Sequence, residues 1–421
     1  MLSNCKHSAE HASQFPRGLV LYLQLVLFLT VLPFLFLLEL YLVKGSFLQA
    51  RLWSPESDRF GDFWHYRYLL QYLHRPEFFA ARDRFAYPAP CAILYQWLYR
   101  LGPHPHLSFN IILWAVEGIS AIFLLRALAG NGLRFFHALG LVLLMLVTSY
   151  PWHTLYDRGN IELFLYIFIA GGVWAWLCGH ERVAAVLWGC AGALKLYPLL
   201  LIALYAKRGS WRTFLLAFST CIGILLLSFW YVGPTMKLAA SGTMWGIRGF
   251  VGTYGAHTRF QELVLDHSFL GGVKEILALP IFRNGDKQIV LSHMYEAVVV
   301  VAGPPLFLRW RRTAPAINQL CVLLTLLMLL PPVSYDYTLV YAYLVIGIVF
   351  HQYLSMERRG QTFHGCVQYV VAFAVLCTAE NWINIMGFEP NGLLKAAALI
   401  TILITLVRYP LRFQGPGLGS A

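Results

Sequence analysis

Long apolar runs constrain this chain more than any other feature of its sequence. Gly18 to Val43, Thr213 to Gly233 and Gly365 to Met386 each reach the roughly 20 apolar residues that cross the hydrocarbon core of a bilayer. Because unpaired backbone groups are costly in lipid, such runs must be helical. Charged residues make up only 12% of the 421 residues, whereas soluble domains carry about 25%. We therefore expect an all-α, polytopic membrane protein that forms one integral membrane domain over residues 1–421.

Twelve spans are expected from the hydropathy pattern. They lie near 18–43, 87–102, 107–126, 134–150, 160–178, 183–206, 213–233, 293–311, 316–333, 337–354, 365–386 and 392–408. The first run is too long and bulky for a cleaved signal peptide, so we interpret it as a retained span. Basic residues cluster in the short loops, for example at Arg309 to Arg312 and at Arg358 with Arg359. Since cytoplasmic loops are enriched in Lys and Arg, these loops are expected inside and the polar intervals 44–86 and 234–292 outside.

Two topologies remain open around the run 87–102, which is short for a span. If it crosses the membrane, Arg126 and Arg134 lie outside and Arg158 lies inside. If it does not cross, these sides are exchanged and a second break is needed further along the chain. The sequence Lys195-Leu196-Tyr197-Pro198 is a suitable place for that break, because proline and a charge both disfavour an uninterrupted buried helix.

Asp62 lies in the one long polar interval of the first half of the chain, Ser54 to Arg84. It opens a helix-like pattern whose apolar side is formed by Phe63, Tyr66, Leu69, Leu70 and Leu73. Aspartate is common as the N-terminal cap of a surface helix. Alternatively, apolar surroundings raise a carboxylate pKa and neighbouring arginines lower it, so Asp62 could be a tuned general base. Glu56 and Asp58 are close enough to take the same role.

Two further charged positions touch predicted spans. Tyr156 to Glu162 reads YDRGNIE, and Lys195 lies deep in the apolar segment Ala193 to Pro198. A charge near the bilayer centre costs about 2.5 kcal/mol or more, so these groups must pair or lie at an interface. Arg158 could grip a phosphate through two hydrogen bonds or form a structural pair with an aspartate. Lys195 could hold the phosphate of a lipid-borne substrate or extend to the interface.

Cationic residues also gather around glycines in the second polar interval. They are Arg248, His257, Arg259, His267 and Lys274. Such a loop could fold over a site and supply positive charge to a leaving phosphate, or it could be solvated. The segment His267-Ser268-Phe269 leads into an amphipathic run that ends at Leu279. Further on, Asp336 could contact a sugar together with its flanking tyrosines, although tyrosines are also common at membrane interfaces. Tyr87 could likewise be an interfacial tyrosine.

Several catalytic motifs do not occur in the sequence. We find no Walker loop, dinucleotide-binding glycine motif, HExxH or nucleophile elbow. The eight cysteines occur singly, without the spacing of a structural zinc site. Without a DxD sequence, a divalent metal coordinated to a nucleotide diphosphate is not expected. We therefore expect neither a metal nor another cofactor, and the scattered positive charge does not indicate a nucleic-acid partner.

Taken together, the motifs resemble a polytopic glycosyltransferase of the GT-C superfamily, and most closely glycosyltransferase family 87. The residues that carry the resemblance are Asp62-Phe63, Tyr87-Pro88 with Pro90, Arg158-Gly159-Asn160 with Glu162, Leu194 to Pro198, Lys207 to Arg212, His267-Ser268-Phe269 and Pro331 to Tyr337. Family members use a polyprenyl-phosphate mannose donor. The Arg-Gly-Asn-x-Glu and Lys-x-Tyr-Pro sequences are also similar to those of the eukaryotic enzyme that adds the first mannose to glycosylphosphatidylinositol.

The resemblance implies a function and roles for individual residues. Interfacial helices in the first outer loop would present Asp62 as the general base on an acceptor hydroxyl. The acceptor would be a glycolipid or glycan, and the donor a polyprenyl-phosphate sugar, mannose by analogy, attacked with inversion at the outer face of a bacterial plasma membrane. The substrate-binding candidates are Arg158, Asn160, Lys195, Tyr197, Arg248, His257, His267 and Asp336. The alternative functions are a transporter or flippase of a lipid or polar solute, and a non-catalytic scaffold.

Overall fold

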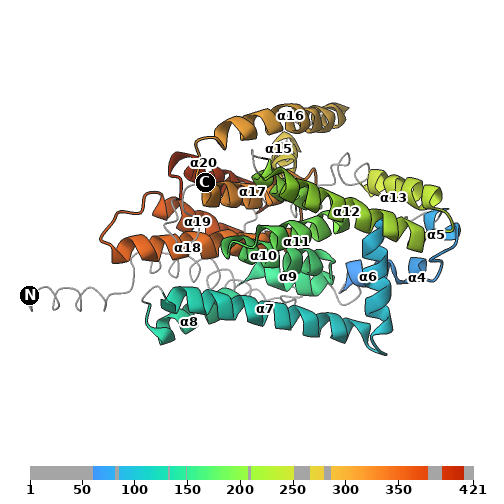
Figure 1. The fold of residues 1–421 in the computed structure, drawn as a ribbon, viewed down its shortest axis with the longest axis horizontal. Helices are drawn as coiled ribbons and strands as arrows, with labels where there is room; N and C mark the ends of the chain where they lie inside the picture. Colours follow the sequence, from blue (N-terminus) through green and yellow to red (C-terminus); the bar gives the residue numbers. More distant parts are fainter. Residues whose placement is uncertain are drawn as a thin grey trace, which may run out of the picture.

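The described part of the chain is built from helices. The computed structural model describes residues 60–80, 85–130, 133–147, 149–206, 210–250, 266–278, 286–377 and 391–411 (Figure 1). The α-helices are α3 (Gly61–His65), α4 (Arg67–Leu70), α5 (Glu77–Ala80), α6 (Ala89–Arg100), α7 (Pro105–Gly130), α8 (Phe135–Val147), α9 (Tyr150–Arg158), α10 (Glu162–Leu177), α11 (Glu181–Leu194), α12 (Trp211–Val232), α13 (Met236–Phe250), α15 (Phe269–Ala278), α16 (Asp286–Trp310), α17 (Ala316–Leu329), α18 (Ala342–Arg358), α19 (Cys366–Cys377) and α20 (Asn391–Arg408). Two 3₁₀ helices, η2 (Tyr197–Tyr205) and η4 (Asp336–Tyr341), complete the set. The predicted all-α class is confirmed.

Four segments of the described residues are long and apolar enough to cross a membrane. They are α7, α12, the segment Asp336–Arg358 that joins η4 to α18, and α20. Only 11% of the most apolar window of α7 and 22% of that of α12 are buried inside the protein, as expected for helices with lipid on most sides. The shorter helices α10, α17 and α19 are also apolar. The chain is therefore an integral, multi-pass membrane protein, whereas the number of spans stays a prediction and the expected span 18–43 lies outside the described residues.

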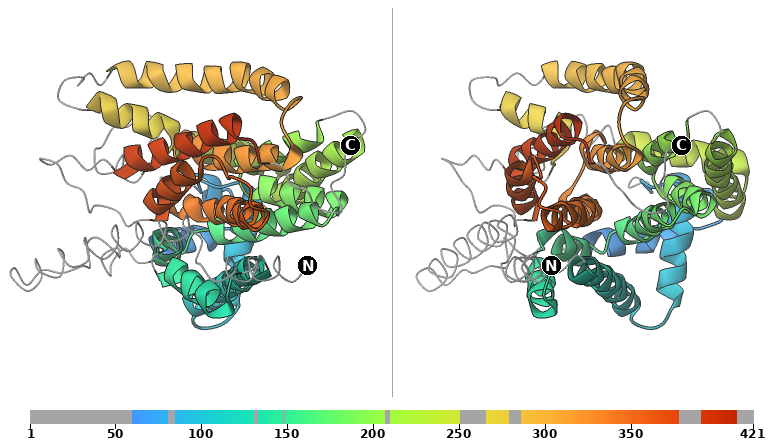
Figure 2. Two further views of the ribbon diagram at one scale, coloured as in Figure 1. Left: turned by 90° about the vertical axis from the view of Figure 1, so that its left-hand side faces the viewer. Right: turned by 60° about the vertical axis from the view of Figure 1, so that its left-hand side comes forward.

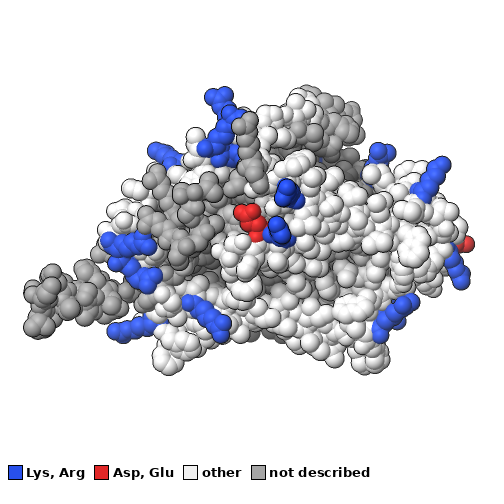
Figure 3. All heavy atoms as spheres, in the orientation of Figure 1, with Lys and Arg blue, Asp and Glu red and all other residues white. Residues whose placement is uncertain are grey.

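Contacts between loops define two ends of the helix bundle. At the first end, which we call the Asp62 end, Arg158 pairs with Asp62 and Lys195 pairs with Glu162. At the opposite end, the Tyr205 hydroxyl donates to the carbonyl of Glu181 and Arg358 donates to the carbonyl of Gly130. Figure 3 shows Lys and Arg side chains toward both ends of the long axis, along the upper edge and, together with Asp or Glu, in a small group near the middle of the face, with wide uncharged areas between them.

Two elements bear on the topologies left open by the sequence. Helix α6 has 12 residues, and it runs across the direction of α7 and α12 in Figure 1 and in the right-hand view of Figure 2. The expected span 183–206 is wrong as a single helix, because α11 ends at Leu194, Lys195 is extended and η2 begins at Tyr197. The Tyr205 hydroxyl reaches back to Glu181, the first residue of α11. The arrangement matches the topology in which 87–102 does not cross and the chain reverses near Lys195.

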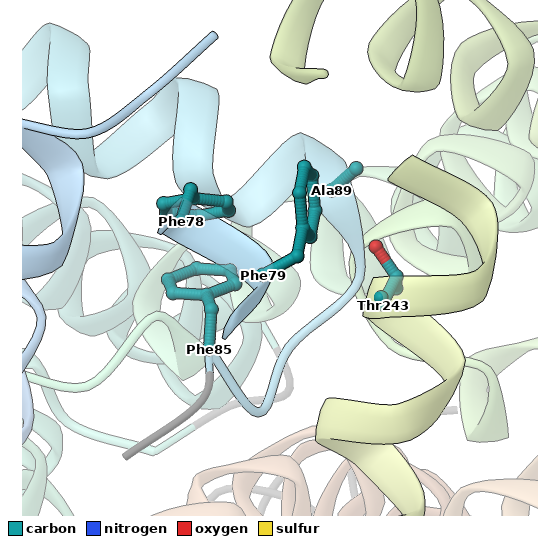
Figure 4. A pocket seen from close by; sticks show the side chains of 6 residues that line it. Phe78, Phe79, Phe85, Ala89 and Thr243 are labelled. Carbon is teal, nitrogen blue, oxygen red and sulfur yellow. The ribbon is translucent and has the colours of Figure 1, made fainter. Parts of the chain in front are cut away.

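The first polar interval forms three short helices and not the continuous helix that its pattern predicts. The chain bends at Tyr66 between α3 and α4, and Phe63 and Leu69 are fully buried beneath it. Helix α13 packs against this interval, with the rings of Phe79 and its neighbours facing Gly242 and Thr243 (Figure 4). The two polar intervals therefore pack against each other at the Asp62 end.

Helix α15 begins where the amphipathic run after His267 was expected. Its first turn is capped by Ser268, whose hydroxyl accepts a hydrogen bond of 2.8 Å from the backbone of Gly271. A single backbone bridge joins Asp266 to Tyr335, just before η4. The second polar interval is thus attached directly to the turn that precedes η4.

Candidate active site

Asp62 is held by two side chains from the turn between α9 and α10. Its carboxylate accepts hydrogen bonds of 2.8 Å from Arg158 Nη2 and of 2.7 Å from Asn160 Nδ2, one on each oxygen. Helix α3 is not capped by a side chain, and the residue before it, Phe60, lies in the left-handed region. The Asp62 carboxylate is therefore committed to Arg158 and Asn160, and the interpretation of Asp62 as a helix cap is wrong.

Gly159 makes this arrangement possible. It ends α9 in the left-handed conformation, with φ of +60°. A Cβ atom at this position would lie 2.7 Å from the ring of Phe60 and 2.9 Å from Cβ of Phe63. Only glycine combines this backbone conformation with so close an approach. The reversal places Arg158 and Asn160 on the two oxygens of one carboxylate.

The pair of Asp62 and Arg158 remains open to a substrate. The Asp62 side chain is 19% exposed and that of Arg158 is 36% exposed. The negative charge of Asp62 raises the pKa of Arg158 above its already high value, so the guanidinium stays charged. Asp62 can therefore accept a proton from a bound hydroxyl, while Arg158 offers its other N–H groups to an anion.

A second, more deeply buried pair lies next to the first. Glu162 is fully buried at the start of α10, and its carboxylate accepts a hydrogen bond of 2.5 Å from Lys195 Nζ. The hydroxyl groups of Tyr197 and Tyr341 donate to the other carboxylate oxygen. These partners compensate a charge that would otherwise be very costly to bury.

Asn160 and two tyrosines join the two pairs into one group. Asn160 Nδ2 also donates to the hydroxyl of Tyr87 over 3.0 Å, and Asn160 Oδ1 accepts the backbone N–H of Glu162. Lys195 Nζ lies 5.3 Å from the ring centre of Tyr87 and 5.5 Å from that of Tyr337, within the range of cation–π attraction. The Asp62 cluster comprises Asp62, Tyr87, Arg158, Asn160, Glu162, Lys195, Tyr197, Tyr337 and Tyr341.

His267 and Asp336 lie in a separate buried group with Lys395. His267 Nδ1 is 3.1 Å from Asp336 Oδ1, and Lys395 Nζ donates to Asp336 Oδ2 over 2.5 Å. His267 Nε2 is 3.1 Å from the hydroxyl groups of Ser334 and Thr338. We call His267, Asp336 and Lys395 the Lys395 cluster. The structure thus brings four of the predicted residues to Asp62, namely Arg158, Asn160, Lys195 and Tyr197, and two to this second cluster.

The remaining candidates lie elsewhere. Arg248 is exposed in the last turn of α13. His257 lies outside the described residues, as do the alternative bases Glu56 and Asp58. No group of His, Cys, Asp and Glu in the described ranges has the arrangement of a metal site.

Sequence reasoning left several members of these clusters without a role. Glu162 follows Asn160 by two residues and lies at the apolar start of a predicted span. Because a buried carboxylate needs a partner, this position indicates that Glu162 pairs with another group. Lys395 lies in an apolar span just as Lys195 does, so the same rule would have selected it. Tyr87 and Tyr337 belong to motifs that carry the family resemblance, whereas Tyr341 carries no signal that separates it from interfacial tyrosines.

The Asp62 cluster has the chemistry of a group-transfer site. A partly exposed carboxylate can take a proton from a hydroxyl nucleophile, and two neighbouring cations can stabilise an anionic leaving group. The family model described as "Glycosyltransferase family 87" matches residues 85–332. This range includes Arg158, Asn160 and Lys195, whereas Asp62 and Asp336 lie outside it. No curated protein and no solved structure matches the chain. Because the family model covers more than half of the sequence, the resemblance noted above is confirmed, and the chain belongs to glycosyltransferase family 87.

Proposed function

We propose that this glycosyltransferase moves mannose from a polyprenyl-phosphate donor to a hydroxyl of a lipid or glycan acceptor. The observation that carries the proposal is the partly exposed carboxylate of Asp62, held 2.8 Å from Arg158 and joined through Asn160 and Tyr87 to Lys195. A donor whose phosphate is anchored in lipid needs cations at the membrane surface, and its monophosphate leaving group needs no nucleotide-binding motif. The sugar itself is assigned by analogy with the family.

The transfer would proceed in one displacement. The acceptor hydroxyl gives its proton to the Asp62 carboxylate as its oxygen attacks the anomeric carbon of the donor. The bond between that carbon and the phosphate oxygen breaks, and the phosphate leaves with the electron pair. Attack opposite the leaving group inverts the anomeric configuration. Arg158 and Lys195 stabilise the charge on the departing phosphate, while Asn160 and Tyr197 hold Asp62 and Glu162 in place.

The second polar interval would contribute from the side of α13. Arg248 and His257 are proposed to approach the donor phosphate when substrate is bound. His267 and Asp336 are buried against each other, so they would act on the reaction through the elements they connect.

The Asp62 end is proposed to face the extracytoplasmic side of a bacterial plasma membrane. Among the described residues, most of the arginines lie at helix ends of the opposite end. They include Arg126, Arg134, Arg182, Arg309, Arg311, Arg312, Arg358, Arg359 and Arg408. Cytoplasmic loops are enriched in such residues, which supports this orientation. A lipid-linked donor also suits the outer surface, where nucleotide sugars are not generally available.

The test is glycosyl transfer by the purified protein in lipid nanodiscs. Radiolabelled polyprenyl-phosphate mannose is offered with a membrane glycolipid extract, and the labelled product is resolved by chromatography. Asp62→Asn should lower kcat by roughly 100-fold to 10,000-fold, the usual contribution of a general base. The matched control is Glu77→Gln, an exposed carboxylate of α5 in the same polar interval, which should retain wild-type kcat.

Two outcomes would contradict the proposal. If Asp62→Asn retains wild-type kcat, Asp62 is not the base. If the wild-type protein gives no labelled product with any acceptor, but moves intact donor between leaflets of proteoliposomes, the chain is a transporter or flippase. Donor phosphates that carry glucose or galactose, tested in parallel, decide the sugar.

A further inference from the structure

The helix η4 carries two of the tyrosines of the Asp62 cluster. Tyr337 places its ring 5.5 Å from Lys195 Nζ, and it lies within electrostatic reach of Asp62 and Arg158. Tyr341 donates its hydroxyl to Glu162. The position of η4 therefore determines one wall of the site.

The same helix is fixed from behind by buried charges. Asp336, the first residue of η4, accepts a hydrogen bond of 2.5 Å from Lys395 and faces His267 at 3.1 Å. The exposed fraction of each of these three side chains is 2% or less. The backbone of His267 also donates to the carbonyl of Ser334 over 3.0 Å. The turn before η4 is thus tied to the second polar interval, and η4 itself is tied to α20.

Lys395 also contacts the element that carries Arg158. Its Nζ lies 4.7 Å from the ring centre of Tyr150, the first residue of α9. Helix α9 packs along η4 and ends at Arg158, which holds Asp62. One buried ammonium group therefore touches two of the elements that deliver side chains to the Asp62 cluster, α9 and η4, although Lys395 itself has no contact with Asp62.

We propose that Lys395 is a positioning residue for sugar transfer. Through Asp336 and Tyr150 it fixes η4 against α9, and so fixes Tyr337 relative to the pair of Asp62 and Arg158. Replacing Lys395 by an uncharged residue leaves Asp336 as a buried charge without its cation, so η4 must shift or admit water. Misplacement of catalytic groups by about 1 Å costs on the order of 100-fold in rate. Only the expected loss of kcat depends on the proposed function, whereas the structural role of Lys395 does not.

The test compares Lys395→Met with the double variant Lys395→Met/Asp336→Asn, in which both charges are removed. At a temperature where each variant is folded, Lys395→Met should lower kcat by about 10-fold to 100-fold, with little change in the KM for the donor. The double variant removes the uncompensated charge of Asp336 and should recover only part of that loss, because the amide introduced by Asp336→Asn can still hydrogen bond to His267 but the link from Lys395 to Tyr150 stays absent. Lys237→Met, which removes an exposed lysine of α13, is the matched control and should retain wild-type kcat.

Hydrogen exchange separates failure of this inference from failure of the proposed function. In Lys395→Met, peptides that cover 150–158 and 334–341 should exchange faster, while peptides from α12 should be unchanged. If the wild type is inactive as a transferase, the exchange result alone decides whether Lys395 fixes these elements. Wild-type exchange in both peptides, or wild-type kcat in folded Lys395→Met, would overturn the inference. A double variant with wild-type kcat would overturn it as well, because the link through Lys395 is absent in that variant.

Discussion

A substitution at Gly159 tests whether the reversal between α9 and α10 holds the site together. Gly159→Ala adds one methyl group to a residue with φ of +60°. The added Cβ would lie 2.7 Å from the ring of Phe60 and 2.9 Å from Cβ of Phe63, which is part of α3 beside Asp62. Gly179→Ala is the matched control, because Gly179 has φ of +81° and no heavy atom within 4 Å of the position its Cβ would take.

The two variants separate backbone strain from the steric clash. A left-handed conformation costs a residue with a Cβ about 1–2 kcal/mol, so Gly179→Ala should lower the free energy of unfolding by that amount. Gly159→Ala carries the same cost and adds the overpacking against Phe60 and Phe63, about 1–3 kcal/mol more. Because α3 must move away from Gly159, Asp62 should separate from Arg158 and Asn160. A shift of about 1 Å should lower kcat on the order of 100-fold.

Denaturant titration in mixed micelles gives the unfolding free energies, and the nanodisc transfer assay gives kcat. We expect Gly159→Ala to be less stable than Gly179→Ala and far less active. Equal stability of the two variants would show that the close packing of Gly159 against α3 does not hold in the protein. Wild-type kcat in Gly159→Ala would show that the distance from Asp62 to its partners does not control the reaction.

Three further predictions concern other contacts. In Gly246→Ala the new Cβ would lie 2.1 Å from the backbone carbonyl oxygen of Phe85, so the free energy of unfolding should fall by about 1–3 kcal/mol. Gly249→Ala is the control, because no heavy atom lies within 4 Å of the position of its new Cβ, and it should not change the unfolding midpoint. Burial raises the pKa of Glu275 from 4.5 to about 8, so the stability contributed by its protonated form is complete below pH 4.5 and is lost as the pH rises through about 8. Glu275→Gln should therefore flatten a plot of unfolding free energy against pH between these two values, and an unchanged slope would contradict the prediction. Lys195→Met leaves the buried carboxylate of Glu162 without its cation and should cost about 3–5 kcal/mol of stability. Adding Glu162→Gln should restore most of this loss in thermal unfolding, and a double variant as unstable as the single one would refute the pairing.

The helices and the ionisable residues that need partners could be predicted from the sequence, whereas the contacts between distant segments could not. Apolar runs gave the helices, and the rule that ionisable groups in a membrane need partners selected Arg158 and Lys195. The pairing of Asp62 with Arg158 joins residues 96 positions apart, and hydropathy does not show which helix ends meet. The direction of α6 was open for the same reason, because 12 residues with apolar character fit a short span or a helix that lies across the bundle.

The side chains that we propose to be functional occupy places where the chain reverses direction. Asn160 lies between α9 and α10, Lys195 between α11 and η2, and Asp336 follows the turn after α17. The long helices between these reversals need only remain apolar and correctly spaced. In a saturation mutagenesis library selected for function, we therefore expect narrow bands of intolerance at the three reversals and around Asp62. Outward-facing positions of α7 and α12 should accept almost any apolar residue, so we expect related sequences to diverge widely along these helices while the proposed reacting groups stay the same.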